Sequence, residues 1–438
     1  MARVGARFLL EEGQSVRGLR YAASSCAVVA VAIGVAACGS SGGGSTGSSG
    51  TTASGKSLTI YSSLPLQGAS RTNSEALVNG IKLALNQAGG KAGQFTINYQ
   101  SLDDSTAQTG KWDPGQTSSD ARKAAQDKST ILYIGEFNSG ASAISIPILN
   151  RAGIGQISPA NTAVGLTSNE AGAEPGEPQK YYPTGKRNYV RVVPKDTIQG
   201  AAVAAVIQSD GCKKPYILND KEVYGQGLAT NTSESLKKEG IPALGNDGWD
   251  PKAANYRSVA SKLAGKGVDC VFLSGIVDNN GVQLTKDIAA GVPNSKIYAP
   301  DGFCESGWVS PKEGGVPTNL DSRLQCTVAT LSPDSYPPEG KKFFTQYEAK
   351  YGKGNLNPYA IYGYAAMSLA LDAIKRAGAN GGDREAVIKS LFETKNLPSV
   401  LGTFSIDQNG DTSITDYGLY KVTNGEIQFS RVIKPSAG

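Results

Sequence analysis

The chain has 438 residues, of which 39% are hydrophobic and 18% charged. Such a length and composition are typical of a globular protein with room for two domains of ordinary size. The formal net charge of +5 is too small to indicate nucleic-acid binding. The absence of histidine excludes Ser-His-Asp and Cys-His catalysis and most zinc sites, so we expect no metal and no cofactor.

Residues 1–37 have the features of an export signal. Arg17 and Arg20 precede a short apolar run over 21–37, and small residues lead to Cys38. The run is too short for a comfortable membrane span. Its last four residues, "VAAC", resemble the bacterial lipobox, in which the chain is cut before the cysteine and lipid joins the sulfur. We therefore expect an extracytoplasmic or periplasmic protein, anchored to the outer face of the cell membrane by lipid on Cys38. An uncleaved anchor helix is the alternative.

Residues 38–56 are almost all Gly, Ser and Thr, which predicts a flexible linker. The stretch over 50–57, "GTTASGKS", matches the phosphate-binding loop of ATPases. That loop functions only between a strand and a helix, because the helix N-terminus and backbone N–H groups must point at the phosphates. Here a linker precedes it, and the strand-like "SLTIYSSL" follows. The match is therefore an accident of composition.

Four cysteines remain beyond the signal region and the lipid site: Cys212, Cys270, Cys304 and Cys326. An even number in an exported protein favours disulfides, and four cysteines allow three pairings. We favour Cys212–Cys270 and Cys304–Cys326, because each pair would lie at the edges of neighbouring elements within one lobe. Four free buried thiols are the alternative. The spacing of the cysteines does not suggest a metal site.

From Ser57 onward, strand and helix patterns alternate in two consecutive βαβ series, which predicts an α/β fold with two doubly wound parallel-sheet lobes. A Thr72–Glu75 capping box opens the first helix. The predicted strands span 57–64, 94–100, 130–135, 155–158, 189–194, 215–219, 269–275, 296–300, 401–406, 417–422 and 427–433. The other predicted helices span 118–128, 140–153, 197–208, 225–239, 256–264, 281–290, 339–351, 358–377 and 384–392. Ligands bind beyond the carboxyl ends of parallel strands, so the cleft between the sheets is the expected site.

Four segments carry a family resemblance: "LPLQGASRTNSEALVNGIKLALNQAGG", "YIGEFNSGASAISIPILNRAGIGQISPANTAVGLT", "LNDKEVYGQGLA" and "KIYAPDGF". They resemble the leucine/isoleucine/valine-type solute-binding proteins of bacterial ABC transporters, over about 57–432. The resemblance implies a type I periplasmic binding protein with a three-stranded hinge, no enzymatic activity and a monomeric state. It also implies permease subunits as partners. The implied lobes are 57–193 plus 333–413 and 195–331 plus 415–438.

The resemblance also implies a set of ligand-binding residues. In the first lobe, Ser139 stands at a helix entry, where its hydroxyl and the following N–H groups can hold a carboxylate. Ala160 would contribute its backbone and Thr162 its hydroxyl. The alternatives are a plain helix cap for Ser139 and a turn hydroxyl for Thr162.

In the second lobe, Tyr224 matches a tyrosine that contacts ligand in the family. Asp301 matches the acid that pairs with the ligand's α-ammonium, although "DG" could also be a simple turn. Asn73 and Ile276 occupy positions where binders of branched-chain amino acids carry tyrosine, and Asn73 could instead cap its helix. The resemblance therefore implies a small molecule with an amino-acid head group, and leaves its side chain open.

Two other function classes, a sensor on the same fold and an exported enzyme, are the alternatives. A sensor or receptor component on the same fold would bind the same ligand without feeding a permease. A binder of amides, urea or other small acids on the same fold is a further alternative. An exported glycosidase could use an acid pair such as Asp103-Asp104, yet adjacent loop residues point in different directions. We therefore expect a binding protein.

Overall fold

The computed structural model describes residues 56–353 and 357–435. The predicted signal, the lipid site at Cys38 and the linker up to residue 55 lie outside these residues. The described chain contains two separate β-sheets, each with its own helices, and so forms two α/β lobes. Within this part of the chain, no helix has the length and apolar character needed to cross a bilayer.

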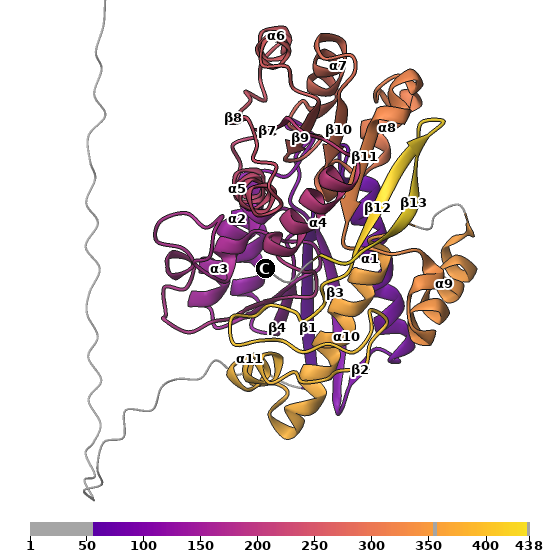
Figure 1. The fold of residues 1–438 in the computed structure, drawn as a ribbon. Helices are drawn as coiled ribbons and strands as arrows, with labels where there is room; N and C mark the ends of the chain where they lie inside the picture. The colour runs from indigo at the N-terminus through magenta and orange to yellow at the C-terminus, as the bar shows by residue number, and fades with distance from the viewer. Residues whose placement is uncertain (1–55, 354–356, 436–438) are drawn as a thin grey trace, which may run out of the picture. The chain divides into compact units, whose positions relative to one another are not determined.

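The sheet of the first lobe has the strand order β2-β3-β1-β4-β5-β6, of which Figure 1 labels β2, β3, β1 and β4. Its pairs are parallel except that β2 runs antiparallel to β3. All five residues of β4 are buried, as expected of a strand covered by helices on both faces. The strands are β1 (Ser57–Leu64), β2 (Lys91–Ala92), β3 (Phe95–Asp103), β4 (Thr130–Ile134), β5 (Gly155–Ser158) and β6 (Tyr189–Arg191).

Helices α1 and α10 lie side by side in the first lobe, although about 290 residues separate them in sequence (Figure 1). Glycines permit this close approach: a Cβ on Gly80 would lie 2.1 Å from the carbonyl oxygen of Ala360, and one on Gly363 equally close to that of Leu77. The helices of this lobe are α1 (Arg71–Gln87), α2 (Pro114–Gln126), α3 (Ser139–Arg151), α9 (Pro338–Tyr351), α10 (Ala360–Arg376) and α11 (Arg384–Phe392).

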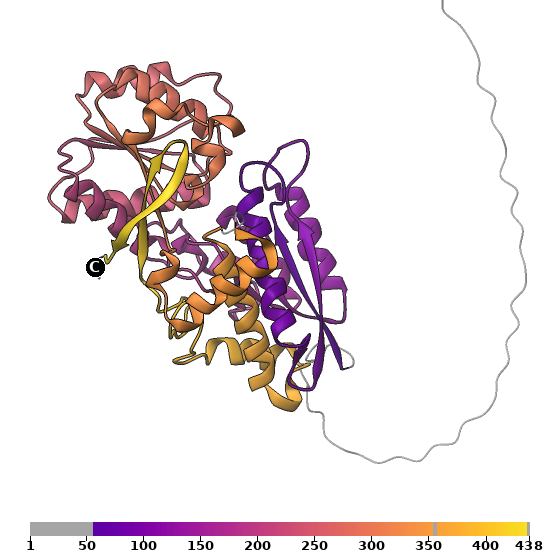
Figure 2. The ribbon, with the colours of Figure 1, turned by 90° about the vertical axis from the view of Figure 1, so that its right-hand side faces the viewer.

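The sheet of the second lobe has the order β13-β12-β11-β10-β9-β7-β8. Its last two strands form an antiparallel hairpin at one edge, drawn in yellow in Figure 2. The strands are β7 (Pro215–Asn219), β8 (Asn246–Gly248), β9 (Cys270–Ser274), β10 (Lys296–Ala299), β11 (Leu324–Val328), β12 (Tyr417–Thr423) and β13 (Glu426–Ile433). The helices are α4 (Asp196–Ser209), α5 (Val223–Lys238), α6 (Arg257–Gly265), α7 (Gly281–Gly291) and the short α8 (Ser306–Val309).

The chain passes between the lobes three times: from β6 to α4, from β11 to α9, and from the segment after α11 to β12. The residue limits given above for the lobes stay a prediction. Both sheets are mostly parallel, as predicted, with antiparallel additions: β2 and β13 are edge strands, and β12 lies between β11 and β13 and runs antiparallel to both.

Other sequence predictions were wrong in detail. Residues 401–406 form isolated bridges rather than a strand, and the short strands β2, β8 and β11 were not predicted. The predicted capping box does not form, because α1 begins at Arg71, before Thr72. A strand does follow the phosphate-loop match, as predicted, since β1 begins at Ser57.

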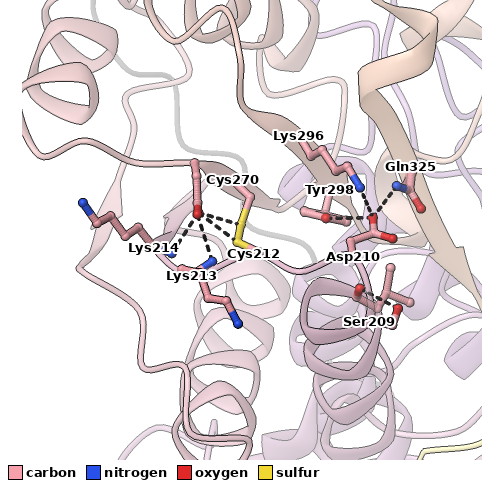
Figure 3. The surroundings of a disulfide bond; sticks show 11 residues. Ser209, Asp210, Cys212, Lys213, Lys214, Cys270, Lys296, Tyr298 and Gln325 are labelled. Carbon is pink, nitrogen blue, oxygen red and sulfur yellow. Dashed lines mark hydrogen bonds and ion pairs between the residues drawn. A yellow bond between two sulfur atoms is a disulfide. The ribbon is translucent and has the colours of Figure 1, made fainter.

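The structure contains both favoured disulfides, Cys212–Cys270 and Cys304–Cys326, with Cα atoms 6.3 and 5.6 Å apart. The first joins Cys212, in the segment between α4 and β7, to Cys270, the first residue of β9 (Figure 3). The carboxylate of Asp269 is close to its sulfurs, but sulfurs joined to each other offer no thiolate to a metal.

Candidate functional site

A narrow cavity of about 20 Å³ lies where the carboxyl ends of strands from both sheets meet. This volume is far below the range of about 300–1,000 Å³ usual for small-molecule sites, so the two walls are close together in this structure. Loops after β4 and β5 supply its first-lobe wall, and loops after β7, β9 and β10 supply the other. The lining residues are Phe137, Asn138, Ser139, Ala160, Thr162, Glu222, Tyr224, Ile276, Asp301 and Gly302.

The first-lobe wall is built from neutral groups around the N-terminus of α3. Ser139 is the first residue of α3, and the side chain of Asn138 before it makes no capping hydrogen bond within the described chain. The first-turn N–H groups of a helix lack partners inside the helix and carry partial positive charge. The hydroxyl oxygen of Ser139 accepts from the N–H of Ala163 at 3.3 Å. This wall therefore suits an anionic group.

A buried arginine supports the loop that carries Ala160 and Thr162. The guanidinium of Arg191 donates to the carbonyl oxygens of Asn161 and Ala163 at 3.2 and 2.8 Å, and pairs with Asp411 at 2.7 Å. Five donors in a fixed plane let one arginine hold several carbonyls at once. The N–H of Ala160 is already donated to the hydroxyl of Ser158 at 3.2 Å. The loop is thus a preformed part of the cavity.

The second-lobe wall centres on the carboxylate of Asp301. One of its oxygens accepts from the hydroxyl of Tyr224 at 2.6 Å and from the amide of Gln199 at 2.7 Å. Its other oxygen accepts from the hydroxyl of Tyr359 at 2.9 Å. Burial raises the pKa of Asp301, while these three donors favour the ionised form. Because a carboxylate can accept about four hydrogen bonds, room remains for a donor from a ligand.

A second acid behind the cavity does not add to this charge. Asp196, the first residue of α4, is fully buried, and its backbone N–H donates to the carbonyl oxygen of Thr162 at 2.8 Å. Burial raises the pKa of Asp196 to about 8. At pH 7 its carboxyl is therefore mostly protonated, so Asp196 adds little negative charge beside Asp301.

Six of the seven predicted ligand residues line the cavity: Ser139, Ala160, Thr162, Tyr224, Ile276 and Asp301. Asn73 does not line it. Its amide donates to Glu305 of the other lobe at 3.1 Å and accepts from Asn357 at 2.7 Å. Asn73 lies inside α1, so the alternative that it caps this helix was wrong. Whether the six residues hold a ligand stays a prediction.

Sequence reasoning missed Tyr359, Gln199 and Glu222. Tyr359 comes from the first lobe, just before α10, and its ring lies 5.3 Å from that of Phe137. Glu222 lines the cavity and pairs across the lobes with Lys111 at 3.2 Å. No local pattern marks these residues, since only the tertiary structure brings Tyr359 to Asp301. Glu222, two residues before Tyr224 in the quoted segment "LNDKEVYGQGLA", could have been considered.

This geometry agrees with the comparisons to known proteins. Residues 59–426 match the family model described as "Periplasmic binding protein". The chain belongs to the periplasmic binding protein family. A curated relative, Leu/Ile/Val-binding protein homolog 2 of Brucella abortus, is 27% identical over 83% of this chain and 89% of its own.

Solved structures of similar proteins share the fold of this periplasmic binding protein. The leucine binding protein LivK of Thermotoga maritima has a TM-score of 0.72 at 24% identity, covering 86% of this chain and 99% of its own. A solute binding protein from R. palustris in complex with benzoate has a TM-score of 0.68 at 19% identity, covering 86% and 97%. The predicted type I fold with two α/β lobes is therefore confirmed. The family to which the chain belongs is one of binding proteins, as predicted.

Proposed function

We propose that this periplasmic binding protein captures an amino acid, of the branched-chain type or a relative, in the cavity between its lobes. It then delivers the ligand to the permease subunits of an ABC transporter. The relative from Brucella abortus, named as a Leu/Ile/Val-binding protein homologue, supports this ligand class. Which amino acid of this class binds depends on the part of the cavity that holds the ligand's side chain.

The observation that carries the proposal is the opposed character of the two walls. The N-terminus of α3 and the Ser139 hydroxyl form a neutral wall with partial positive charge, and Asp301 forms an anionic one. A zwitterion places its carboxylate against the first and its ammonium against the second. Two lobes that each hold one pole are drawn together by such a ligand.

An aromatic acid is the second candidate, because one structural neighbour was solved with benzoate. Asp301 opposes it. A benzoate has one negative charge and no ammonium, and no lysine or arginine lines the cavity among the described residues. Burying a ligand anion near an unpaired carboxylate is costly.

Titration calorimetry tests the proposal, with L-leucine, L-isoleucine and L-glutamine against acetamide, urea and benzoate. We expect binding of at least one amino acid, and none of benzoate. Leucine with its carboxylate amidated, or with its amine acetylated, should bind at least tenfold more weakly than leucine itself. Binding of urea or benzoate without any amino acid would refute the zwitterion proposal.

The transport role and the lipid anchor need separate tests. A strain lacking the protein should lose uptake of the bound amino acid, whereas a stand-alone sensor would leave uptake unchanged. Labelling with a radioactive fatty acid should mark the full-length protein and leave Cys38→Ala unmarked. A labelled Cys38→Ala variant would contradict the anchor.

A further inference from the structure

The two disulfides of the second lobe lie toward opposite ends of its strands. Cys212 precedes β7 and Cys270 begins β9, so this bridge joins the amino ends of two strands (Figure 3). Cys304 follows the carboxyl end of β10 and is joined to Cys326 in β11. Ligand sites in α/β lobes lie at the carboxyl ends. Only the second bridge is therefore on the ligand side.

The segment held by Cys304 carries the charged group of the cavity. Asp301 and Gly302 line the cavity and precede Cys304 by three and two residues. Glu305, next to Cys304, accepts the cross-lobe hydrogen bond from Asn73. One short segment, 300–305, thus contributes both to the cavity wall and to a direct contact between the lobes.

Cys326 is a firm anchor for this segment. It lies in the middle of β11, is 1% exposed, and pairs with Ala299 of β10 on one side and Tyr420 of β12 on the other. Cys304, by contrast, lies in a loop outside the sheet, where several backbone hydrogen bonds are local. The N–H of Cys304 donates to the carbonyl of Asp301 at 3.0 Å, and that of Glu305 to Phe303 at 2.8 Å. One backbone hydrogen bond reaches farther, from the N–H of Val277 to the carbonyl of Gly302 at 2.9 Å. A loop with so few long-range backbone bonds shifts more easily than a strand inside a sheet.

We propose that the Cys304–Cys326 disulfide is a positioning device for Asp301, which fixes the loop 300–305 on the sheet and so sets ligand affinity. Cys212–Cys270 has no such role and contributes only to global stability. Asp301 can accept from Tyr224, Gln199 and Tyr359 together only if its carboxylate is held in one place. The ligand part of this inference rests on the proposed function, and the loop part does not.

A competing explanation is that packing alone holds the loop. The ring of Phe303 is fully buried and lies 5.6 Å from that of Trp308 and 6.3 Å from that of Trp249. A Cβ on Gly302 would lie 2.6 Å from the carbonyl oxygen of Gly275, so the backbone there is tightly packed. If these contacts suffice, removing the disulfide leaves the loop unchanged.

Hydrogen exchange on the ligand-free full chain separates the two explanations. In C304A/C326A, peptides covering 300–305 should exchange at least tenfold faster than in wild type. In the matched control, C212A/C270A, these peptides should exchange at the wild-type rate. The control should nevertheless lose at least as much thermal stability, because its cysteines are 58 residues apart against 22, and longer closed loops stabilise more. Equal exchange of 300–305 in both variants would overturn the proposal.

A second measurement covers the case in which C304A/C326A does not fold. In C212A/C270A, Cys304–Cys326 is the one bridge left among the described cysteines, so a phosphine reductant acts on this bridge alone. Mass spectrometry after alkylation counts the freed thiols. Exchange of 300–305 should then rise on reduction. Unchanged exchange with both thiols freed would overturn the proposal.

Affinity for L-leucine, measured by calorimetry, tests the consequence for binding. We expect at least a tenfold loss in C304A/C326A and less than a twofold change in C212A/C270A. Equal affinities in all three proteins would refute the link between the bridge and the site. A wild-type protein that binds no amino acid would instead contradict the proposed function, while the exchange result still decides the role of the bridge.

Discussion

The two walls of the cavity hold their functional groups in different ways. The first-lobe wall consists of the N-terminus of helix α3 and backbone groups. The nearby Arg191 donates to backbone carbonyls and pairs with Asp411, and it does not line the cavity. The second-lobe wall has two carboxylates: Glu222, which pairs with Lys111, and Asp301, to which three side chains donate. Partial charges spread over a helix end are hard to remove by one substitution, whereas a single carboxylate is easy to remove. The two walls should therefore respond differently to mutation.

The largest expected effect is at Asp301. Asp301→Ala should weaken binding of the amino acid about 100-fold or more, because a buried ammonium then lacks its partner. Calorimetry measures the affinity. Asp301→Asn is the control for side-chain shape. Its affinity should fall nearly as much, because asparagine keeps the size of the side chain and removes its charge. Unchanged affinity in both variants would exclude Asp301 from the site.

A smaller effect is expected at Ser139. Ser139→Ala removes one hydroxyl but leaves the N–H groups of α3 in place, so affinity should fall only about tenfold. Thr162→Ala should behave in the same way. The comparison of the walls fails if Ser139→Ala loses as much affinity as Asp301→Ala, because one side chain would then dominate each wall.

Acid pH should weaken binding through Asp301. Burial raises the pKa of Asp301 above the ordinary aspartate value near 3.9. The ligand's ammonium needs the ionised form, so affinity is fully present above the raised pKa and is lost as the pH falls through it. We expect affinity to fall as the pH is lowered from neutral in calorimetric titrations. Asp301→Asn should bind with an affinity that does not change over this range. A flat profile in the wild type would count against Asp301 as the charged partner.

The smallest effect is expected away from the cavity, where the lobes touch directly. The carboxylate of Asp278 accepts from the backbone N–H of Ala69 and the hydroxyl of Ser70, both at 3.1 Å. Asp278→Ala removes this contact between the lobes, which should lower the fraction of molecules with both walls in place. We expect about threefold weaker binding of any ligand, with faster dissociation.

The matched control is Lys186→Ala, which removes an exposed ion pair with Glu385 inside the first lobe. Exposed ion pairs contribute little to stability, and this one does not join the lobes. The affinity of Lys186→Ala for the ligand should equal that of the wild type. If Asp278→Ala also equals the wild type, the Asp278 contact does not affect binding.

Much of the fold could be predicted from the sequence. The alternation of apolar strands with amphipathic helices fixed most elements, with β5, β7 and α11 placed to the residue. The failures have physical reasons. Strands β2 and β8 have only two and three residues, too few to show an alternation of apolar and polar side chains. Strand β11 follows a long segment of short helical turns, and no helix pattern next to it marks it as part of a βαβ series. Residues 401–406 alternate like a strand but meet no neighbouring strand.

The sequence by itself determined the chemistry of the site: a serine at a helix start, an acid after a strand, and no histidine. The position of each group follows from local patterns, because strand ends and helix starts are encoded within a few residues. Only the tertiary structure decided that Tyr359 donates to Asp301, that Asn73 contacts Glu305, and that the two disulfides lie toward opposite ends of the strands of one sheet. These contacts join residues 58 or more apart, or depend on strand order, and no local pattern in the chain specifies either.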